Sequence, residues 1–200
     1  MLKVAKNKGL FGIGIEEDVF WILPFLNYYG EVLSEDFNIE TSTAFNFYFD
    51  LRDKYNFSPT KSQIGSLTLA QMYLDEKLAI YLSGRWMYPK IKESAQFNWE
   101  VMSLPIGKNP LPCDASGWAV TKNSKHKEGS LALVKYLSNE KSSDYFAKTG
   151  LVVPARVSSS RFLNNELHNE KVFLEVVGTS KKTFLPQNYK KLADKINTKF

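Results

Sequence analysis

The sequence is poor in the residues that build catalytic and metal centres. It has one cysteine and two histidines among 200 residues, so an internal disulfide and a metal site made of thiolates are both excluded. Cys113 lies in PLPCDASG with no activating feature nearby, and no G-x-S-x-G motif is present. We therefore expect no enzyme, no metal and no cofactor.

Long apolar runs and clustered charges are also missing. The chain has no apolar run of about 18 residues, and its start, MLKVAKNKGLFGIG, lacks the apolar segment and the cleavage site of a signal peptide. The net charge of +5 comes from scattered lysines, which are paired only at 181–182 and 190–191. No basic stripe interleaved with aromatic residues stands out. The sequence thus predicts no membrane span, no export signal in this chain and no nucleic-acid binding.

Aromatic residues are abundant, with 14 Phe, 10 Tyr and 4 Trp, and several lie at helical spacing. Residues 17–29 predict a helix broken at Pro24 and closed by Gly30, and residues 41–56 predict a helix capped by Ser42 or Thr43. Other helices are expected at 67–77, 87–96 and 168–177, as a pair between 125 and 150, and from 187 toward 200.

Short apolar stretches between these helices indicate strands. LAIYL (78–82) is typical of a buried strand and ends at Gly84, while 99–103 and SGWAVT (116–121) indicate two further strands. Because helices and strands alternate, the fold class is α/β.

Four motifs follow one another along this α/β chain: YLDEKLAIYLSGRW (73–86), SLPIG (103–107), SGWAVTKNSK (116–125) and GLVVPA (150–155). Their order and spacing resemble those of the bacterial extracellular solute-binding proteins of family 1, which serve ABC importers of sugars. The chain departs from the family pattern at Glu76 and Ser116, where the family has glycine.

The resemblance implies a fold and a location. The fold would be periplasmic-binding-protein-like (type II), with residues 1–105 and 158–200 forming a C-terminal lobe, a mixed sheet flanked by helices. Residues 110–155 would be a crossing segment that packs on an N-terminal lobe, and this lobe is expected to be missing from the chain. Without it, the apolar faces of 116–121 and 129–137 would be exposed. The full-length parent would be a lipoprotein in the periplasm or at the cell surface, held to the membrane only by a lipid anchor.

The resemblance also suggests binding residues. A sugar site combines flat aromatic rings, which stack on C–H faces, with planar hydrogen-bonding groups for the hydroxyls. Trp86 and Arg85 fit that chemistry; alternatively, Trp86 fills the core and Arg85 faces solvent or pairs with a carboxylate. Asp114, Ser116 and Gly117 stand where the family approaches its ligand, or they form a simple lead-in to a strand.

Two more candidates lie outside these motifs. Trp21, on the first predicted helix, either lines the cleft or belongs to the core. Tyr189 corresponds to a region that often supplies another aromatic to the cleft. Both are included in the predicted ligand site.

The predicted function is that of a binding protein whose two lobes close around a carbohydrate and deliver it to a membrane permease, here as a truncated piece. A non-sugar solute, such as a polyamine, a peptide or an anion, is the alternative, as is an interaction module or a remnant without function. An enzyme would need a convergent acid–base pair, and the available carboxylates, Asp36, Asp75 and Glu76, have the setting of turn and surface residues.

Overall fold

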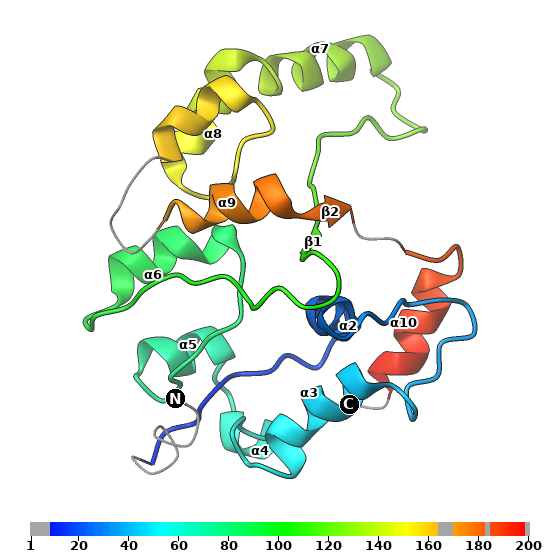
Figure 1. The fold of residues 1–200 in the computed structure, drawn as a ribbon. Coiled ribbons are helices and arrows are strands. Elements are labelled where there is room, and N and C mark those ends of the chain that lie inside the picture. Colours follow the sequence, from blue (N-terminus) through cyan, green and yellow to red (C-terminus); the bar gives the residue numbers. More distant parts are fainter. Residues whose placement is uncertain (1–8, 164–169, 183–184, 199–200) are drawn as a thin grey trace. The chain divides into compact units, whose positions relative to one another are not determined.

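Residues 9–163, 170–182 and 185–198 are described by the computed structural model, in which the chain divides into two units. Unit 1 comprises Met1–Leu82, Leu104–Cys113 and Thr179–Phe200, and unit 2 comprises Ser83–Ser103 and Asp114–Gly178. In both units, segments that are distant in the sequence come together (Figure 1). The unit boundaries differ from those expected for lobes and assign no lobe to either unit, so the lobe division stays a prediction.

Unit 1 begins with two consecutive helices. The 3-10 helix η1 (Val19–Ile22) runs into α2 (Leu23–Tyr29), with Pro24 in the first turn of α2 and Gly30 ending it at φ 77°. Proline lacks an N–H group and is tolerated in a first turn, while glycine readily adopts the left-handed conformation that closes a helix. The helix predicted at 17–29 is confirmed, with its break and its stop.

The next helix, α3 (Thr43–Asp53), is fixed by side chains that cap its start. Ser42 Oγ accepts a hydrogen bond from the Phe45 amide at 3.2 Å. The Glu31 carboxylate accepts two more, from the amides of Thr43 at 2.7 Å and Ala44 at 3.3 Å. Amides in the first turn of a helix have no partner within the helix, so these contacts stabilise it. The predicted helix and its Ser42 cap are confirmed.

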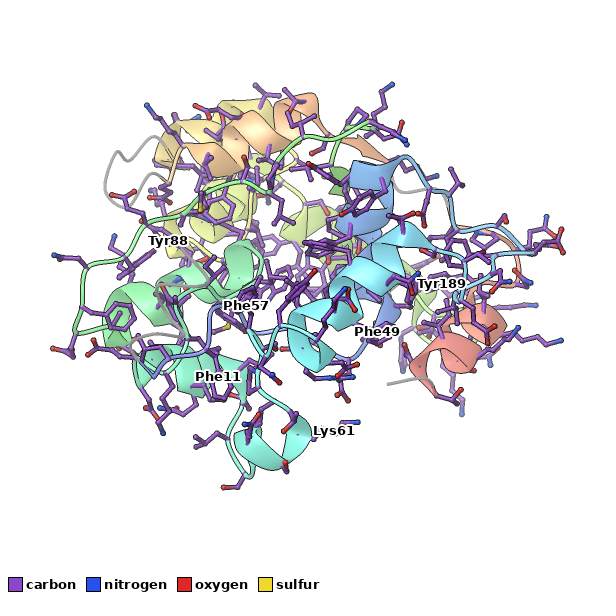
Figure 2. All side chains as sticks on the ribbon, turned by 60° about the horizontal axis from the view of Figure 1, so that its bottom comes forward. Phe11, Phe49, Phe57, Lys61, Tyr88 and Tyr189 are labelled. Atoms are coloured by element: carbon purple, nitrogen blue, oxygen red, sulfur yellow. The ribbon has the colours of Figure 1, made fainter. Side chains whose placement is uncertain are left out.

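The core of unit 1 lies between η1, α2, α3 and the last helix, α10 (Tyr189–Asn197). Asn197 ties α10 to η1, because its Oδ1 accepts from the Val19 amide and its Nδ2 donates to Asp18, both at 3.0 Å. Partly buried aromatic residues surround this core, among them Phe49, Phe57 and Tyr189 (Figure 2). Its fully buried side chains include Ile22, Leu26, Phe45, Tyr48 and Ile196.

Two short helices, α4 (Lys61–Ile64) and α5 (Leu69–Leu74), complete the helices in the described part of unit 1. Lys61 forms an ion pair with Glu17, which also pairs with Arg52 of α3 at 2.7 Å. The helix expected at 67–77 is shorter in the structure and begins after Thr68, whose hydroxyl accepts from the Gln71 amide.

The mixed sheet expected from the sequence is reduced to short parallel pairings in the described residues. Strand β1 (Pro112–Cys113) pairs with β2 (Lys181–Lys182). The segment 78–82 forms only isolated parallel bridges, Phe11 with Leu78 and Gly14 with Tyr81.

The Phe57 carbonyl explains why the pairing between residues 11–14 and the segment 78–82 is interrupted. The amides of Gly12 and Ile13 donate to the Phe57 carbonyl, at 2.7 and 3.1 Å. Alternate residues of a strand face the same neighbour, so Ile13 is the residue after Phe11 that would pair with the segment 78–82, and because its amide is already bonded the ladder is interrupted.

In its described residues, the regular secondary structure of unit 2 is helical. It contains the 3-10 helices η2 (Arg85–Met87) and η3 (Val157–Leu163) and the helices α6 (Tyr88–Ser94), α7 (Lys127–Leu137), α8 (Glu140–Thr149) and α9 (Val172–Thr179). Asn139 caps the start of α8, and Gly150 ends it at φ 75°, as expected. Residues 168–169 of the helix predicted at 168–177 lie outside the described residues, and its remainder corresponds to α9.

The strands predicted at 99–103 and 116–121 are wrong, since both segments are irregular. Residues 116–119 are exposed, and the described part of unit 2 contains no strand to pair with them. An extended segment without a neighbour leaves its backbone groups to water and gains nothing from a strand conformation.

Helix α7 exposes the apolar side chains that its sequence would place in a core. Leu131, Leu133 and Tyr136 are 51%, 57% and 66% exposed, and α7 has no buried residue. The expected exposure of this helix is therefore observed. None of the helices in the described ranges has the length and hydrophobicity that crossing a membrane requires.

Candidate functional site

The first candidate residue, Trp86, lies in a tight turn at the start of unit 2. Gly84 precedes η2 in an extended conformation, and its carbonyl accepts from the Met87 amide at 3.1 Å. The Trp86 ring folds back over Gly84, so a Cβ atom there would lie 2.0 Å from Cζ3 of the ring. Any other residue at position 84 would displace the ring.

Trp86 is 50% exposed, which is unusual for so large an apolar side chain. Because the ring rests on a glycine backbone, its orientation is held from one side while half of its surface remains accessible. The residue is therefore not a core residue in this structure. Such an arrangement suits a flat stacking surface.

Arg85, the neighbour of Trp86, is buried at 6% exposure and pairs with Glu170. Its guanidinium lies over two aromatic rings, 4.5 Å from the centroid of Tyr88 and 5.0 Å from that of Phe173. Of the alternatives for Arg85, the structure shows pairing with a carboxylate. The pair joins η2 to the segment before α9 and anchors the turn that carries Trp86.

Glu170 is the residue of this arrangement that the sequence did not reveal. It is 5% exposed and lies 85 positions from Arg85, with no motif to connect the two. Burial, the Glu170 charge and a hydrogen bond to Glu170 together raise the pKa of Tyr88 to about 12. Glu170 thus interacts with both Arg85 and Tyr88.

Three other candidates, Asp114, Ser116 and Gly117, lie on the surface of unit 2 in an irregular segment. Asp114 Oδ1 accepts from the Ala115 amide at 2.8 Å, and a Cβ atom at Gly117 would meet open space. The neighbouring Trp118 is 56% exposed and its ring centroid is 6.2 Å from that of Phe146. The structure therefore provides an accessible surface at these residues.

The last two candidates belong to unit 1. Trp21 and Tyr189 are partly buried and pack against the core of that unit, and Trp21 makes an edge contact with Phe20 at 5.6 Å. The predicted site residues are therefore divided between the two units, with Trp86, Arg85, Asp114, Ser116 and Gly117 in unit 2.

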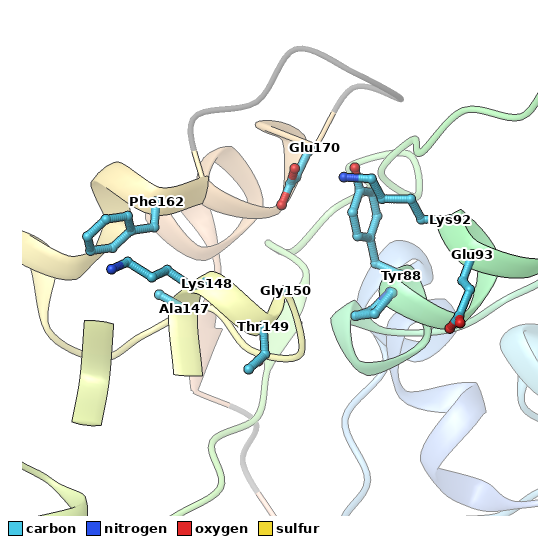
Figure 3. Close-up of a pocket in the computed structure, with 10 residues that line it drawn as sticks. Tyr88, Lys92, Glu93, Ala147, Lys148, Thr149, Gly150, Phe162 and Glu170 are labelled. Carbon is cyan, nitrogen blue, oxygen red and sulfur yellow. The ribbon is translucent and has the colours of Figure 1, made fainter. Parts of the chain in front are cut away.

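Unit 2 also contains a cavity of about 540 Å³ that none of the predicted residues lines (Figure 3). It lies between α6, the end of α8, Phe162 and Glu170. The cavity is lined by Tyr88, Pro89, Lys92, Glu93, Ala147, Lys148, Thr149, Gly150, Phe162 and Glu170. In the described ranges no cluster of three or more histidine, cysteine or acidic side chains could hold a metal ion.

The sequence matches the model of one protein family. The profile of the bacterial extracellular solute-binding proteins matches residues 1–171, most of the chain. The chain has no significant match among curated proteins.

Several solved structures have a similar fold. The ABC substrate-binding protein from Listeria monocytogenes in complex with cycloalternan is 12% identical, with a TM-score of 0.73 over 98% of this chain and 55% of its own. UgpB from Mycobacterium tuberculosis in complex with glycerophosphocholine is 17% identical, with a TM-score of 0.72 over 95% and 53%. Maltose-bound MalE3 from T. maritima is 18% identical, with a TM-score of 0.70 over 98% and 56%.

The similar structures indicate the fold of this chain and show how much of their length it covers. The fold is periplasmic-binding-protein-like, and the chain spans about half the length of each of these three proteins.

Proposed function

We propose that this chain, which belongs to the family of bacterial extracellular solute-binding proteins, is part of the binding component of an ABC importer and takes a carbohydrate as its solute. The family consists of binding proteins and not of enzymes, so the activity is recognition and delivery. The observation that carries the proposal is the exposed ring of Trp86, held on Gly84 at the start of η2.

The ring suits a sugar for chemical reasons. A pyranose presents C–H groups on its faces and hydroxyls on its rim, so a flat indole stacks on a face while polar groups bind the rim. Asp114 and Ser116 would supply such polar groups and Gly117 a close backbone approach, and Arg85 would act mainly by holding the Trp86 turn. Two of the similar structures hold carbohydrates, cycloalternan and maltose, which supports this solute class.

We also propose Trp21 and Tyr189 as contributors to the solute site, from the lobe that residues 1–105 and 158–200 would form. Binding of this kind depends on two bodies that close around the solute, because closure adds contacts that neither body provides alone. We propose residues 1–105 and 158–200 as parts of one lobe and 110–155 as a crossing segment that packs on the other.

The exposed face of α7 supports this division. Leu133 and Tyr136 are three positions apart and share one side of the helix, and Leu131 is exposed as well, so α7 presents apolar side chains of the kind that proteins usually cover. The similar structures are almost twice as long as this chain, so they include additional polypeptide that would cover such a face.

Location and partners follow from the proposed role. The family is extracellular, and we propose that the full-length protein works in the periplasm or at the cell surface, where a lipid anchor keeps it beside the membrane. Its macromolecular partner would be the permease of the importer, which receives the closed, loaded form.

A non-sugar solute is the second candidate. UgpB, which has a similar fold, binds glycerophosphocholine, so this fold also accommodates a charged solute.

The proposal is tested by thermal-shift screening with mono- and oligosaccharides, and with glycerophosphocholine, polyamines and peptides as the competing set. Both this chain and the full-length protein proposed above would be screened. A carbohydrate that binds should raise the melting temperature of the full-length protein, and the increase should grow with the ratio of its concentration to its dissociation constant. Stabilisation by the competing set alone would rule out the carbohydrate.

A further inference from the structure

Arg85 occupies the middle of the turn that carries the Trp86 ring. The ring folds back over Gly84, and Arg85 is the residue between the two. The Gly84 carbonyl accepts from the Met87 amide at 3.1 Å, so the backbone turns tightly around Arg85. A side chain leaves its backbone in one of a few staggered rotamers, so the direction of the ring depends on how the backbone of this turn is held.

The Arg85 side chain is enclosed by its own helix and by two segments that are distant in the sequence. Its Cζ atom lies 4.5 Å from the ring centroid of Tyr88 and 5.0 Å from that of Phe173 at the start of α9. A Cβ atom at Gly150, where α8 ends, would lie 3.5 Å from Nη2. Because close-packed groups move only together with their neighbours, the position of Arg85 is tied to the end of α8 and the start of α9.

Within this enclosure, Glu170 provides the contact that has a direction. An aromatic ring attracts a cation over its whole face, whereas a carboxylate binds a guanidinium at particular N–H groups. The Nη2 group of Arg85 donates to Oε1 of Glu170, and the side chains of both residues are 6% exposed. Water therefore competes little for this hydrogen bond, and the carboxylate fixes where the guanidinium lies.

We propose that Glu170 is a positioning residue of the solute site: through Arg85 it fixes the turn from which the Trp86 ring presents its exposed surface. The inference rests on the proposed function, because it concerns the ring assigned to the solute, and it adds a residue from outside the four motifs. A side chain that orients a binding group from behind changes the affinity of the site without binding the solute itself.

The first test measures how firmly the ring is held, with no ligand present. In the ¹⁵N-labelled full chain, the {¹H}–¹⁵N NOE of an indole N–H group falls when its ring moves on the picosecond to nanosecond timescale. Two variants remove the ion pair: Glu170→Gln removes only the charge, and the double variant Arg85→Met, Glu170→Leu replaces both partners by apolar residues. We expect the Trp86 NOE to fall in the double variant and, by a smaller amount, in Glu170→Gln.

Two controls separate positioning from a general loosening of unit 2. Glu93→Gln removes an exposed carboxylate of the same unit and should leave the Trp86 NOE unchanged. Trp118, at 56% exposure against 50% for Trp86, belongs to the same unit and should keep its NOE in every variant. The indole signals, from positions 21, 86, 99 and 118, are assigned by single Trp→Phe variants. An unchanged Trp86 NOE in both pair variants, or an equal fall at Trp118, would overturn the proposal.

The second test distinguishes a positioning residue from one that binds the solute. Calorimetry gives the affinity of the full-length protein for the carbohydrate with the largest thermal shift, for Glu170→Gln with and without Trp86→Ala. We expect Glu170→Gln alone to weaken binding roughly three- to tenfold and to cause no further loss in the Trp86→Ala background, because it acts through the ring. Additive losses would contradict the inference. If no carbohydrate binds, the proposed function fails, while the NOE measurement still decides whether Glu170 holds the ring.

Discussion

Removal of the Glu170 carboxylate is predicted to destabilise unit 2 strongly, because it breaks an ion pair in which both partners are buried. Glu170→Ala leaves the Arg85 guanidinium buried at 6% exposure with no counter-charge among the described residues. Breaking a buried pair in this way costs about 3–5 kcal/mol, because the remaining charge stays desolvated. At roughly 2–4 °C per kcal/mol for a chain of this size, the melting temperature should fall by roughly 6–20 °C.

The assay is thermal and urea unfolding of Glu170→Ala beside Glu93→Ala, which removes an exposed carboxylate of the same unit. Glu93→Ala should change the free energy of unfolding by less than ~0.5 kcal/mol. The double variant Arg85→Met, Glu170→Leu should recover most of the loss, since apolar replacements of a buried pair are close to neutral. The reasoning is refuted if Glu170→Ala is no more destabilising than Glu93→Ala.

Three further predictions follow from burial and pKa. Leu26→Ala, in the unit 1 core at 1% exposure, should cost about 2–5 kcal/mol in urea unfolding, whereas the exposed Val32→Ala should cost far less. Burial and the neighbouring charges of Asp18 and Glu17 raise the pKa of Glu16, so stability falls as pH rises through its ordinary value of 4.5. Glu16→Gln should therefore raise the free energy of unfolding at pH ~7 and leave it unchanged at pH ~3. A variant that is less stable than the wild type at pH ~7 would contradict the prediction. The pKa of Tyr88 is raised to about 12, so this residue contributes stability that is complete below pH ~10 and is lost as pH rises toward 12. In Tyr88→Phe, the free energy of unfolding should therefore fall less steeply with pH above pH ~10 than in the wild type.

Local signals in the sequence were sufficient for several helices. Ser42 caps α3 and Gly150 ends α8, and each acts on amides or carbonyls within a few residues of itself. Pro24 likewise marks the start of α2 because it removes its own N–H group. Such features depend only on neighbouring residues and can be read from a single sequence.

Features that depend on distant partners could not be read in this way. The apolar segment 78–82 has the composition of a strand, but the Phe57 carbonyl accepts from the Ile13 amide, which would have continued its pairing. Glu170 similarly becomes part of the Arg85 arrangement only through the fold. For the candidate site, the motif identified Trp86, and the fold showed that its ring is exposed on Gly84 while Arg85 is buried.

The most direct test of the central claim, stacking of a sugar on Trp86, is the calorimetric affinity of the best carbohydrate from the thermal-shift screen for three proteins. These are the wild type, Trp86→Phe and Trp86→Ala, each made in the proposed full-length protein. An aromatic anchor of a binding site is worth about 2 kcal/mol or more, so Trp86→Ala should weaken binding by roughly 30-fold, while Trp86→Phe retains a flat ring and should lose much less. Equal affinities of Trp86→Ala and the wild type, with both proteins folded, would contradict the account.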